Sequence, residues 1–280
     1  MATARHAGGV EVVEIELRSA RWPQELAGLS IVQLSDLHYR NPASGALVRA
    51  GVALANDLQP DIVVLTGDYV ARSTRHAADC ARELSRLRAP HGVFAVLGNH
   101  EVWTDADYIA RELAGAGIVT LRDERVGLDV GGRCLWLVGI EDTGYTGYNV
   151  PPLNSIARFR KAWRPKVEIL ERLLAPIPAS EPRIVLVHNP DFVTMLPNEP
   201  IDLVLAGHTH GGQIRLPLID APVVPSCFGN RHARGLLRAS NGAVCYVNKG
   251  IGLWPVRLRL SCRSEVTRIR LYPAASQRAV

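Results

Sequence analysis

The sequence lacks the cysteine pairs that build thiolate metal sites or disulfide frameworks. Its five cysteines are odd in number, scattered between residues 80 and 262, and never spaced as Cys-x-x-Cys. Scattered cysteines of this kind are typical of proteins in a reducing compartment, and they argue against a thiolate zinc site. The chain is therefore expected to be cytoplasmic.

Long apolar segments are also missing. Residues 1–9 contain no apolar run that would serve as a signal peptide, and no stretch approaches the roughly 18 apolar residues of a membrane span. No internal repeat, low-complexity tract or linker interrupts the 280 residues. We expect a single domain over residues 1–280, with residues 1–9 flexible, that is cytoplasmic or at most peripheral on the inner membrane face.

Acidic residues are scarce in one part of the chain. Residues 231–280 contain ten Lys or Arg and only one acid, Glu265, which gives this segment a net charge of +9. The first 230 residues carry −4, so the C-terminal segment holds all of the positive excess. Such asymmetry indicates either an anionic partner or a solvated basic face.

Apolar periodicity predicts an alternation of strands and helices in the first half of the chain and β-structure in its last third. The expected strands cover residues 10–17, 29–34, 61–66, 93–97, 134–140, 184–187, 203–206, 244–247, 256–260 and 267–271. The expected helices cover residues 47–58, 77–88, 108–116 and 155–174, and residues 141–152 are expected to form a loop. The first half favours a sheet sandwiched by helices, and the last third is expected to be antiparallel.

Polar residues with metal-binding chemistry follow five of the expected buried strands. The clearest case is Leu203–Ala206, which is followed by Gly207 and the pair His208 and His210. The whole set comprises Asp36, His38, Asp68, Asn99, His100, His188, His208 and His210. Each has a structural alternative, such as a helix cap for Asp36, a turn for Asp68 or a hydrogen-bonded core position for His188. Because ligands bind beyond the carboxyl ends of strands in open α/β sheets, the set as a whole predicts a ligand site.

The chemistry of these residues narrows the ligand. Aspartate, asparagine and histidine without cysteine suit Mn, Fe, Zn, Co or Ni better than Ca. Seven ligands are too many for one catalytic ion, so we expect two divalent metal ions, with Mn as the first choice. The two aspartates neutralise only half of the charge of the two divalent metal ions. The remaining positive charge would attract a phosphate group, and paired ions would generate the attacking hydroxide.

These residues resemble the five signature blocks of calcineurin-like metallophosphoesterases. The blocks are Asp36-x-His38, Gly67-Asp68, Gly98-Asn99-His100-Glu101, His188 and Gly207-His208-x-His210. The resemblance implies a four-layer α/β/β/α sandwich. It also implies that Asp36, His38 and His210 bind one metal, that Asn99, His188 and His208 bind the other, and that Asp68 bridges both. His100 would be the catalytic residue, acting near the leaving group.

Glu101 stands where many members have Asp, and we expect it to be structural. Histidines 6, 76, 91 and 232 match no block and are expected at the surface.

Within the family, the sequence around the blocks is similar to that of a bacterial branch whose members are often membrane-associated. The likeness rests on residues 187–191, 207–214 and 249–252. Members of this branch include phosphodiesterases and hydrolases of nucleotide-linked precursors of lipid A. This chain departs from the pattern because no N-terminal membrane anchor is evident in it.

The expected function is hydrolysis of a phosphodiester or pyrophosphate by a hydroxide that two metals activate. A nucleotide-linked lipid is one expected substrate. The alternatives are a non-catalytic metal-binding scaffold and a nucleic-acid or nucleotide phosphodiesterase, although no clear aromatic and basic platform for nucleic acid is present. Basic residues beside Phe159 and Trp163, and the Arg-Leu alternation of residues 254–260, suggest peripheral contact with an anionic membrane. The same alternation also suits a strand with one solvated face.

Overall fold

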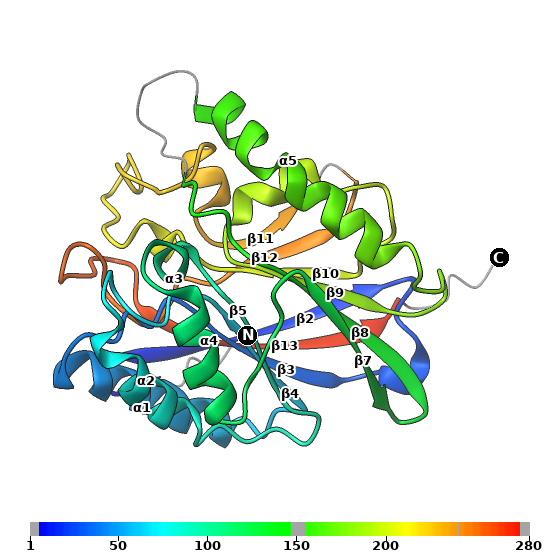
Figure 1. Ribbon diagram of the computed structural model, residues 1–280, viewed down its shortest axis with the longest axis horizontal. Coiled ribbons are helices and arrows are strands. Elements are labelled where there is room, and N and C mark those ends of the chain that lie inside the picture. Colours follow the sequence, from blue (N-terminus) through cyan, green and yellow to red (C-terminus); the bar gives the residue numbers. More distant parts are fainter. Residues whose placement is uncertain (1–5, 147–154, 240, 275–280) are drawn as a thin grey trace.

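The computed structural model describes residues 6–146, 155–239 and 241–274. Within these residues, two sheets lie face to face and helices cover their outer faces (Figure 1). The predicted four-layer α/β/β/α sandwich is confirmed.

The first sheet combines strands from both ends of the chain. Its order is β1 (His6–Ala7), β2 (Val10–Ser19), β13 (Ser264–Pro273), β3 (Leu29–Leu34), β4 (Ile62–Thr66), β5 (Val93–Val96) and β6 (Val119–Thr120). The strands from β3 to β6 run parallel, whereas β13 is parallel to β2 and antiparallel to β3. The C-terminal strand therefore lies inside the sheet that the N-terminal strands begin.

The second sheet has six strands. Its order is β11 (Gly235–Arg238), β12 (Val244–Val247), β10 (Leu203–Ala206), β9 (Arg183–Val187), β8 (Arg133–Ile140) and β7 (Glu124–Val130). Strands β8, β9, β10 and β12 are parallel, and the outermost strands β7 and β11 are antiparallel to their neighbours. The two sheets are joined where Gln33 Nε2 donates to Ala206 O at 2.9 Å.

The helices follow from the alternation of side chains along the strands. Val32 and Leu34 of β3 point outward against α1 (Pro42–Asp57), α2 (Ala77–Leu84) and α4 (Ala106–Gly115). Ile31 of the same strand points inward, into a core that both sheets share. On the other outer face, α5 (Ser155–Leu174) buries Phe159 and Trp163 against the second sheet. A short helix, α3 (Asn99–Trp103), is separated from the end of β5 by two residues.

Several predictions of local structure are confirmed and others are wrong. Residues 155–174 and 203–206 form the predicted helix and strand with the predicted bounds. Residues 256–260 form no strand, and only Leu260 makes an isolated bridge, to Ile214. The last third is mixed rather than antiparallel, because β12 and β13 pair in parallel with β10 and β2.

The predictions for flexible and irregular segments fall partly outside the described residues. Residues 1–5 lie outside them, whereas His6–Ala7 pair with β2. The predicted loop 141–152 is irregular from 141 to 146, and its remainder is not described. Among the described residues, no helix has both the length and the apolar character needed to cross a membrane.

Candidate metal centre

Seven predicted ligands gather where strands of both sheets end. Asp36 and His38 follow β3, Asp68 follows β4, and Asn99 follows β5. His188 comes directly after β9, and His208 and His210 follow β10 after one glycine. All seven side chains are buried. The two sheets therefore contribute ligand atoms to one small volume.

One group of ligand atoms surrounds the imidazole of His38. Its Nε2 lies 2.9 Å from His210 Nε2, and His210 Nε2 lies 3.5 Å from Asp36 Oδ1. Ligand atoms bound to one transition-metal ion at about 2.1 Å lie about 3 Å from one another. The separations in this group match that spacing.

A second group surrounds His188 Nε2. It lies 3.1 Å from Asn99 Oδ1 and 3.2 Å from His208 Nδ1. The other ring nitrogen of His188 lies 2.6 Å from Thr66 O, and it donates a hydrogen bond to this carbonyl. A carbonyl acceptor behind the ring fixes the imidazole so that Nε2 faces a metal.

Asp68 connects the two groups. Its Oδ2 is 3.6 Å from His38 Nε2 and 3.3 Å from His188 Nε2. Its other oxygen, Oδ1, accepts a hydrogen bond from the backbone N–H of His100 at 3.0 Å. The carboxylate is therefore held with one free oxygen between the two groups.

Asp36 is held in a comparable way. Its Oδ2 accepts from Ser35 Oγ at 2.6 Å and from the backbone N–H of His208 at 2.9 Å. The hydrogen bond from His208 links the end of β3 to the end of β10, so two strand ends from different sheets keep a fixed separation.

The backbone around the ligands adopts an uncommon conformation. Five of the seven have positive φ, namely Asp36 (51°), His38 (44°), Asp68 (58°), His208 (72°) and His210 (52°). Such conformations cost free energy in non-glycine residues and concentrate at functional sites. The strand ends thus turn sharply and direct their side chains inward.

Close packing around the ligands requires glycine at two turns. A Cβ on Gly98 would lie 2.3 Å from Asp68 Oδ1, and one on Gly207 would lie 1.9 Å from Ser35 Oγ and 2.4 Å from Asp36 Oδ2. Any side chain at either position would displace a carboxylate.

Burial and mutual charge set the protonation of the group. Burial lowers the pKa of His38 and of His208 to about 3, and it raises the pKa of Asp36 to about 6. Burial alone would also lower the pKa of His188, but the adjacent Asp68 carboxylate raises it well above its usual value. The metal-free site therefore holds neutral His38 and His208 and a charged His188 beside Asp68.

The donor set fits transition-metal ions. Burial keeps His38 and His208 neutral, and neutral imidazoles and carboxylates are the ligand forms that such metals need. Three sets of side chains bring ligand atoms within 4.8 Å of one another, and each contains Asp68 or His38. They are Asp36, His38 and His210; Asp68, His188 and His208; and His38, Asp68 and His100.

His100 lies beside both ligand groups, but its ring makes none of the short contacts that define them. Its Nδ1 accepts from the backbone N–H of Arg72 at 3.3 Å, and its Nε2 lies 4.0 Å from Asp68 Oδ2. Burial lowers its pKa, so the imidazole is neutral with the proton on Nε2. His100 therefore presents an N–H group toward the site.

Glu101 supports the same turn from behind. Its Oε2 accepts from the backbone N–H groups of Asp68 at 2.8 Å and of Gly98 at 2.9 Å, and its Oε1 accepts from Tyr69 at 2.8 Å. The side chain is completely buried. This agrees with the structural role expected from the sequence.

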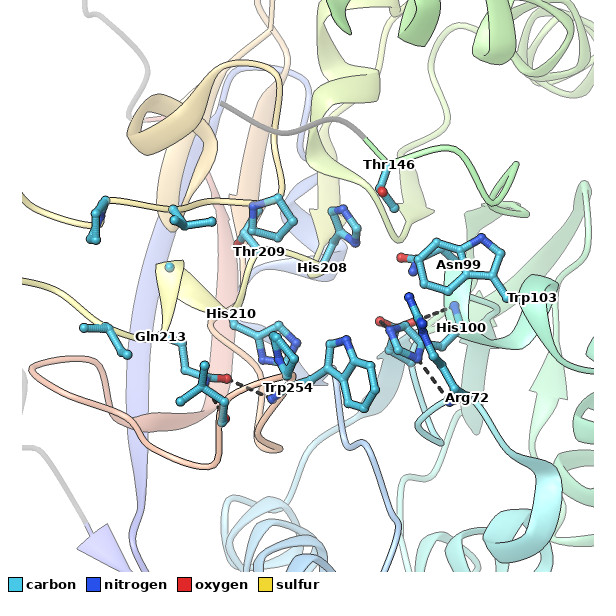
Figure 2. Close-up of a pocket in the computed structure, with 18 residues that line it drawn as sticks. Arg72, Asn99, His100, Trp103, Thr146, His208, Thr209, His210, Gln213 and Trp254 are labelled. Carbon is cyan, nitrogen blue, oxygen red and sulfur yellow. Dashed lines mark hydrogen bonds and ion pairs between the residues drawn. The ribbon is translucent and has the colours of Figure 1, made fainter. Parts of the chain in front are cut away.

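Four candidate ligands form the floor of a cavity of about 490 Å³, namely Asp68, Asn99, His208 and His210. Figure 2 shows His208 and His210 on one side of it and Asn99, His100 and Arg72 on the other. The lining residues that were not predicted as part of the site include Arg72, Trp103 and Trp254. The Arg72 guanidinium lies 5.4 Å from the Trp103 ring centre and 5.7 Å from that of Trp254.

The cavity lining combines two kinds of side chain. The candidate ligands and Arg72 supply polar groups, whereas residues 212–225 and 254–256 contribute a wall of aliphatic side chains. That wall consists of Ile214, Pro222, Val223, Pro225, Pro255 and Val256.

The structure corrects three expectations about polar and aromatic residues outside the site. His232 is not a free surface residue, because it is half-buried with Nδ1 2.9 Å from Asp191 Oδ1. Phe159 and Trp163 are core residues rather than exposed anchors. Arg259 turns inward and donates to the carbonyls of residues 249, 250 and 252.

Two facing sheets covered by helices, with a histidine, aspartate and asparagine cluster at their strand ends, define a class of metal-dependent hydrolase. The sequence profile of calcineurin-like phosphoesterases matches residues 29–212, and the chain belongs to that family. It is accordingly a metal-dependent phosphoesterase.

Comparison with known proteins supports this assignment. The chain is 34% identical over 264 residues to the phosphodiesterase YaeI of Escherichia coli K12, covering 92% of this chain and 87% of that one. It is 29% identical to LpxG of Chlamydia trachomatis, a UDP-2,3-diacylglucosamine pyrophosphatase, with 88% and 84% of the two chains covered.

The fold also matches a solved structure. The phosphopantetheinyl hydrolase of Mycobacterium tuberculosis superposes with a TM-score of 0.50 at 15% identity, covering 79% of this chain and 89% of that one. This likeness concerns the fold alone.

Proposed function

We propose that the protein is a dinuclear hydrolase that cleaves the phosphodiester or pyrophosphate group of a lipid-linked substrate. The observation that carries this proposal is the position of Asp68 Oδ2, within 3.6 Å of His38 Nε2 and 3.3 Å of His188 Nε2. One carboxylate oxygen shared by two ligand groups is what a bridged metal pair needs.

The ligands divide between the two ions as follows. Asp36, His38 and His210 would hold one metal, Asn99, His188 and His208 would hold the other, and Asp68 would contribute to both. When bound, the ions supply a hydroxide nucleophile and positive charge for the phosphoryl oxygens. Manganese is the first candidate because nitrogen and oxygen ligands without thiolate suit it, and Fe, Zn, Co and Ni share that preference.

His100 is the proposed catalytic residue of the protein itself. The backbone N–H of Arg72 holds its Nδ1 at 3.3 Å, so its Nε2–H is directed toward the floor of the cavity. From there it donates a hydrogen bond to the leaving oxygen, on which negative charge develops as the ester bond breaks.

The cavity supports the class of substrate. Arg72 provides a cation near the floor, and its position between Trp103 and Trp254 suits a second phosphate next to the one that is cleaved. The aliphatic wall suits an acyl chain on the same molecule. A nucleotide-linked lipid, the substrate class in the name of the LpxG relative, offers both groups.

We further propose that residues 1–280 form one domain that works in a reducing compartment, on the inner face of a membrane. The C-terminal strand β13 lies between β2 and β3, so the residues beyond 212 complete the sheet that the family match begins. All five cysteines lie in the described residues, and none is paired in a disulfide.

A panel of substrates tests the proposed function. Manganese-loaded protein would be assayed with UDP-diacylglucosamine, UDP-glucose, bis(p-nitrophenyl) phosphate, cyclic nucleotides and single-stranded DNA. We expect kcat/KM to be highest for the acylated pyrophosphate. Asp68→Ala should abolish turnover, whereas Asp57→Ala, at an exposed position at the end of α1, should not affect it.

Two results would overturn the proposal. Failure to hydrolyse any phosphoester with metal bound would favour the non-catalytic scaffold. Preference for DNA or cyclic nucleotides would favour the nucleic-acid or nucleotide phosphodiesterase.

A further inference from the structure

Exposed aliphatic side chains gather on two segments next to the cavity. Seven of the twelve large hydrophobic side chains that are exposed among the described residues belong to them. They are Leu216, Leu218, Ile219 and Val223 in one segment and Val256, Leu258 and Leu260 in the other, and we call these seven the apolar rim. Leu218 is fully exposed (106%) and Ile219 is 63% exposed. An exposed cluster of this kind marks an interaction site more often than isolated surface residues do.

Backbone hydrogen bonds hold the two segments side by side. Leu260 donates its N–H to Gln213 O at 3.0 Å, and Arg215 donates its N–H to Leu260 O at 2.9 Å. The side chain of Gln213 adds a bond from Nε2 to Val256 O at 2.6 Å. Both segments project from the same side of the molecule in Figure 1, one in yellow and the other in orange. The apolar rim is therefore one surface.

The outermost side chains are carried by a closed turn. Leu216 and Asp220 exchange two backbone hydrogen bonds of 3.0 Å, and Arg215 forms an ion pair with Asp220. Leu218 and Ile219 lie between these residues, at the tip of the turn. These bonds hold the turn in shape although it has no hydrophobic core of its own, and the turn presents two aliphatic side chains to solvent.

The apolar rim continues the aliphatic wall of the cavity. Val223 and Val256 belong to both, and Ile214 of the wall pairs with Leu260 of the rim. A molecule lying on the rim would therefore meet the mouth of the cavity directly.

The surroundings of the rim are basic. Between residues 203 and 264 the chain has eight Lys or Arg and one acid, Asp220, which Arg215 engages. Lys249 and Arg259 are engaged internally, but Arg257 is exposed between Val256 and Leu258, and Arg234 is exposed near Arg215. A second copy of this chain would bring like charges together, whereas an anionic surface would complement them.

We propose that the apolar rim docks on an anionic lipid bilayer, with Leu218 and Ile219 entering the boundary between headgroups and acyl chains. Aliphatic side chains with flanking cations bind at this depth, through buried apolar area and attraction to anionic lipids. The surface includes part of the segment 254–260 that the sequence suggested, but not α5, because Phe159 and Trp163 are buried. This inference deepens the proposed function, because docking there would place the cavity mouth at the membrane where a lipid-linked substrate resides.

Vesicle co-sedimentation tests the docking surface without any substrate. The full chain would be mixed with vesicles of phosphatidylglycerol and phosphatidylethanolamine, or of phosphatidylcholine alone. We expect binding to the anionic vesicles only, and weaker binding at high salt. The double variant Leu218→Ser/Ile219→Ser should bind about tenfold or more weakly. Arg257→Gln should lose part of the salt-sensitive component. The control Val119→Ser, at an exposed position on the edge strand β6, should bind like wild type.

Three results would overturn the docking proposal. They are equal binding to neutral vesicles, equal binding by the double variant and the control, and concentration-dependent dimerisation that the double variant abolishes.

Turnover of bis(p-nitrophenyl) phosphate without lipid tests the proposed function separately from the docking proposal. The double variant should keep that turnover, because neither residue lines the cavity. Vesicle binding without hydrolysis would leave the docking surface intact and remove the proposed function.

Discussion

At the scale of single residues, each candidate ligand is aimed by its backbone and by one or two hydrogen bonds. Asp36 and Asp68 each engage one oxygen with backbone N–H groups and keep the other directed at a histidine. Thr66 O holds the ring of His188 from behind at 2.6 Å. These contacts are made by the protein itself, so folding supplies part of the free energy that orders the ligands.

Replacing His100 with asparagine should separate catalysis from metal binding. His100→Asn keeps a small polar side chain at the same place but removes the Nε2–H that we assign to the leaving oxygen. Loss of such assistance typically lowers kcat by about 10²–10⁴-fold. We expect that loss with an alkyl or glycosyl phosphoester and a smaller one with nitrophenyl esters, whose leaving group needs little stabilisation. Metal content, measured by mass spectrometry, should stay at the wild-type value. A fall in bound metal would instead identify His100 as a ligand.

The clustering of the candidate ligands could be predicted from sequence because they follow buried strands, where position in the chain fixes position in space. Arg72, Trp103 and Trp254 could not, since loops of irregular path bring them to the cavity. Arg259 was misassigned to the surface for a related reason. Its inward direction depends on carbonyls of residues 249–252, which no local pattern reveals.

At the scale of elements, short strands and sharp turns place the site, and the helices mainly cover the sheets. Gly98 and Gly207 allow the ends of β5 and β10 to pass within contact distance of Asp68 and Asp36.

Residues 256–260, which were predicted to form a strand and do not, show the limit of prediction from apolar periodicity. Alternating arginine and aliphatic residues there find no neighbouring strand beyond the single bridge at Leu260. Alternation indicates a strand only when a partner is available to pair with it.

Two glycine substitutions should have opposite effects on stability. In Gly207→Ala the new Cβ would lie 1.9 Å from Ser35 Oγ, so the end of β10 or β3 must move. Overpacking of this kind costs about 1–3 kcal/mol in the free energy of unfolding, and metal affinity should fall with it. Gly115→Ala is the matched control, because Gly115 lies in α4 and nothing occupies the space of its Cβ within 4 Å. It should stabilise the protein by about 0.5–1 kcal/mol. Urea unfolding of both variants checks this, and equal destabilisation would contradict the assigned packing.

At the scale of the whole molecule, the two ends of the chain meet in one sheet and much of the C-terminal charge is used inside the fold. Arg268 pairs with Glu14, and Lys249 pairs with Glu11 and Glu265. The net charge of +9 in residues 231–280 therefore overstates the basic surface. The alternation of elements favoured one sheet sandwiched by helices, and only the family resemblance implied the second sheet of the four-layer sandwich. The parallel placement of β12 and β13 could not be predicted, because it depends on strands far away in the sequence.

The affinity for metal should depend on pH in a definite direction. Asp68 raises the pKa of His188 well above its usual value, so the metal-free site carries a proton on His188 at neutral pH. A metal must displace that proton, whereas His38 and His208, with pKa values of about 3, are already neutral. Apparent Mn²⁺ affinity should therefore rise about tenfold per pH unit near neutrality, and it should fall further below about pH 6 as Asp36 is protonated. Calorimetric titration over this range measures the slope. His91→Asn, remote from the ligand set, should not change the slope, and an affinity independent of pH would contradict the assigned charges.

Anomalous scattering from crystals of the manganese-loaded protein tests the two-metal site most directly. We expect two peaks per chain, about 3.5–4 Å apart. One should lie among Asp36, His38 and His210, the other among Asn99, His188 and His208, and Asp68 should lie between them. The Asp68→Ala variant should weaken or lose both peaks. A single peak in the fully loaded protein, or peaks away from these side chains, would contradict the dinuclear site.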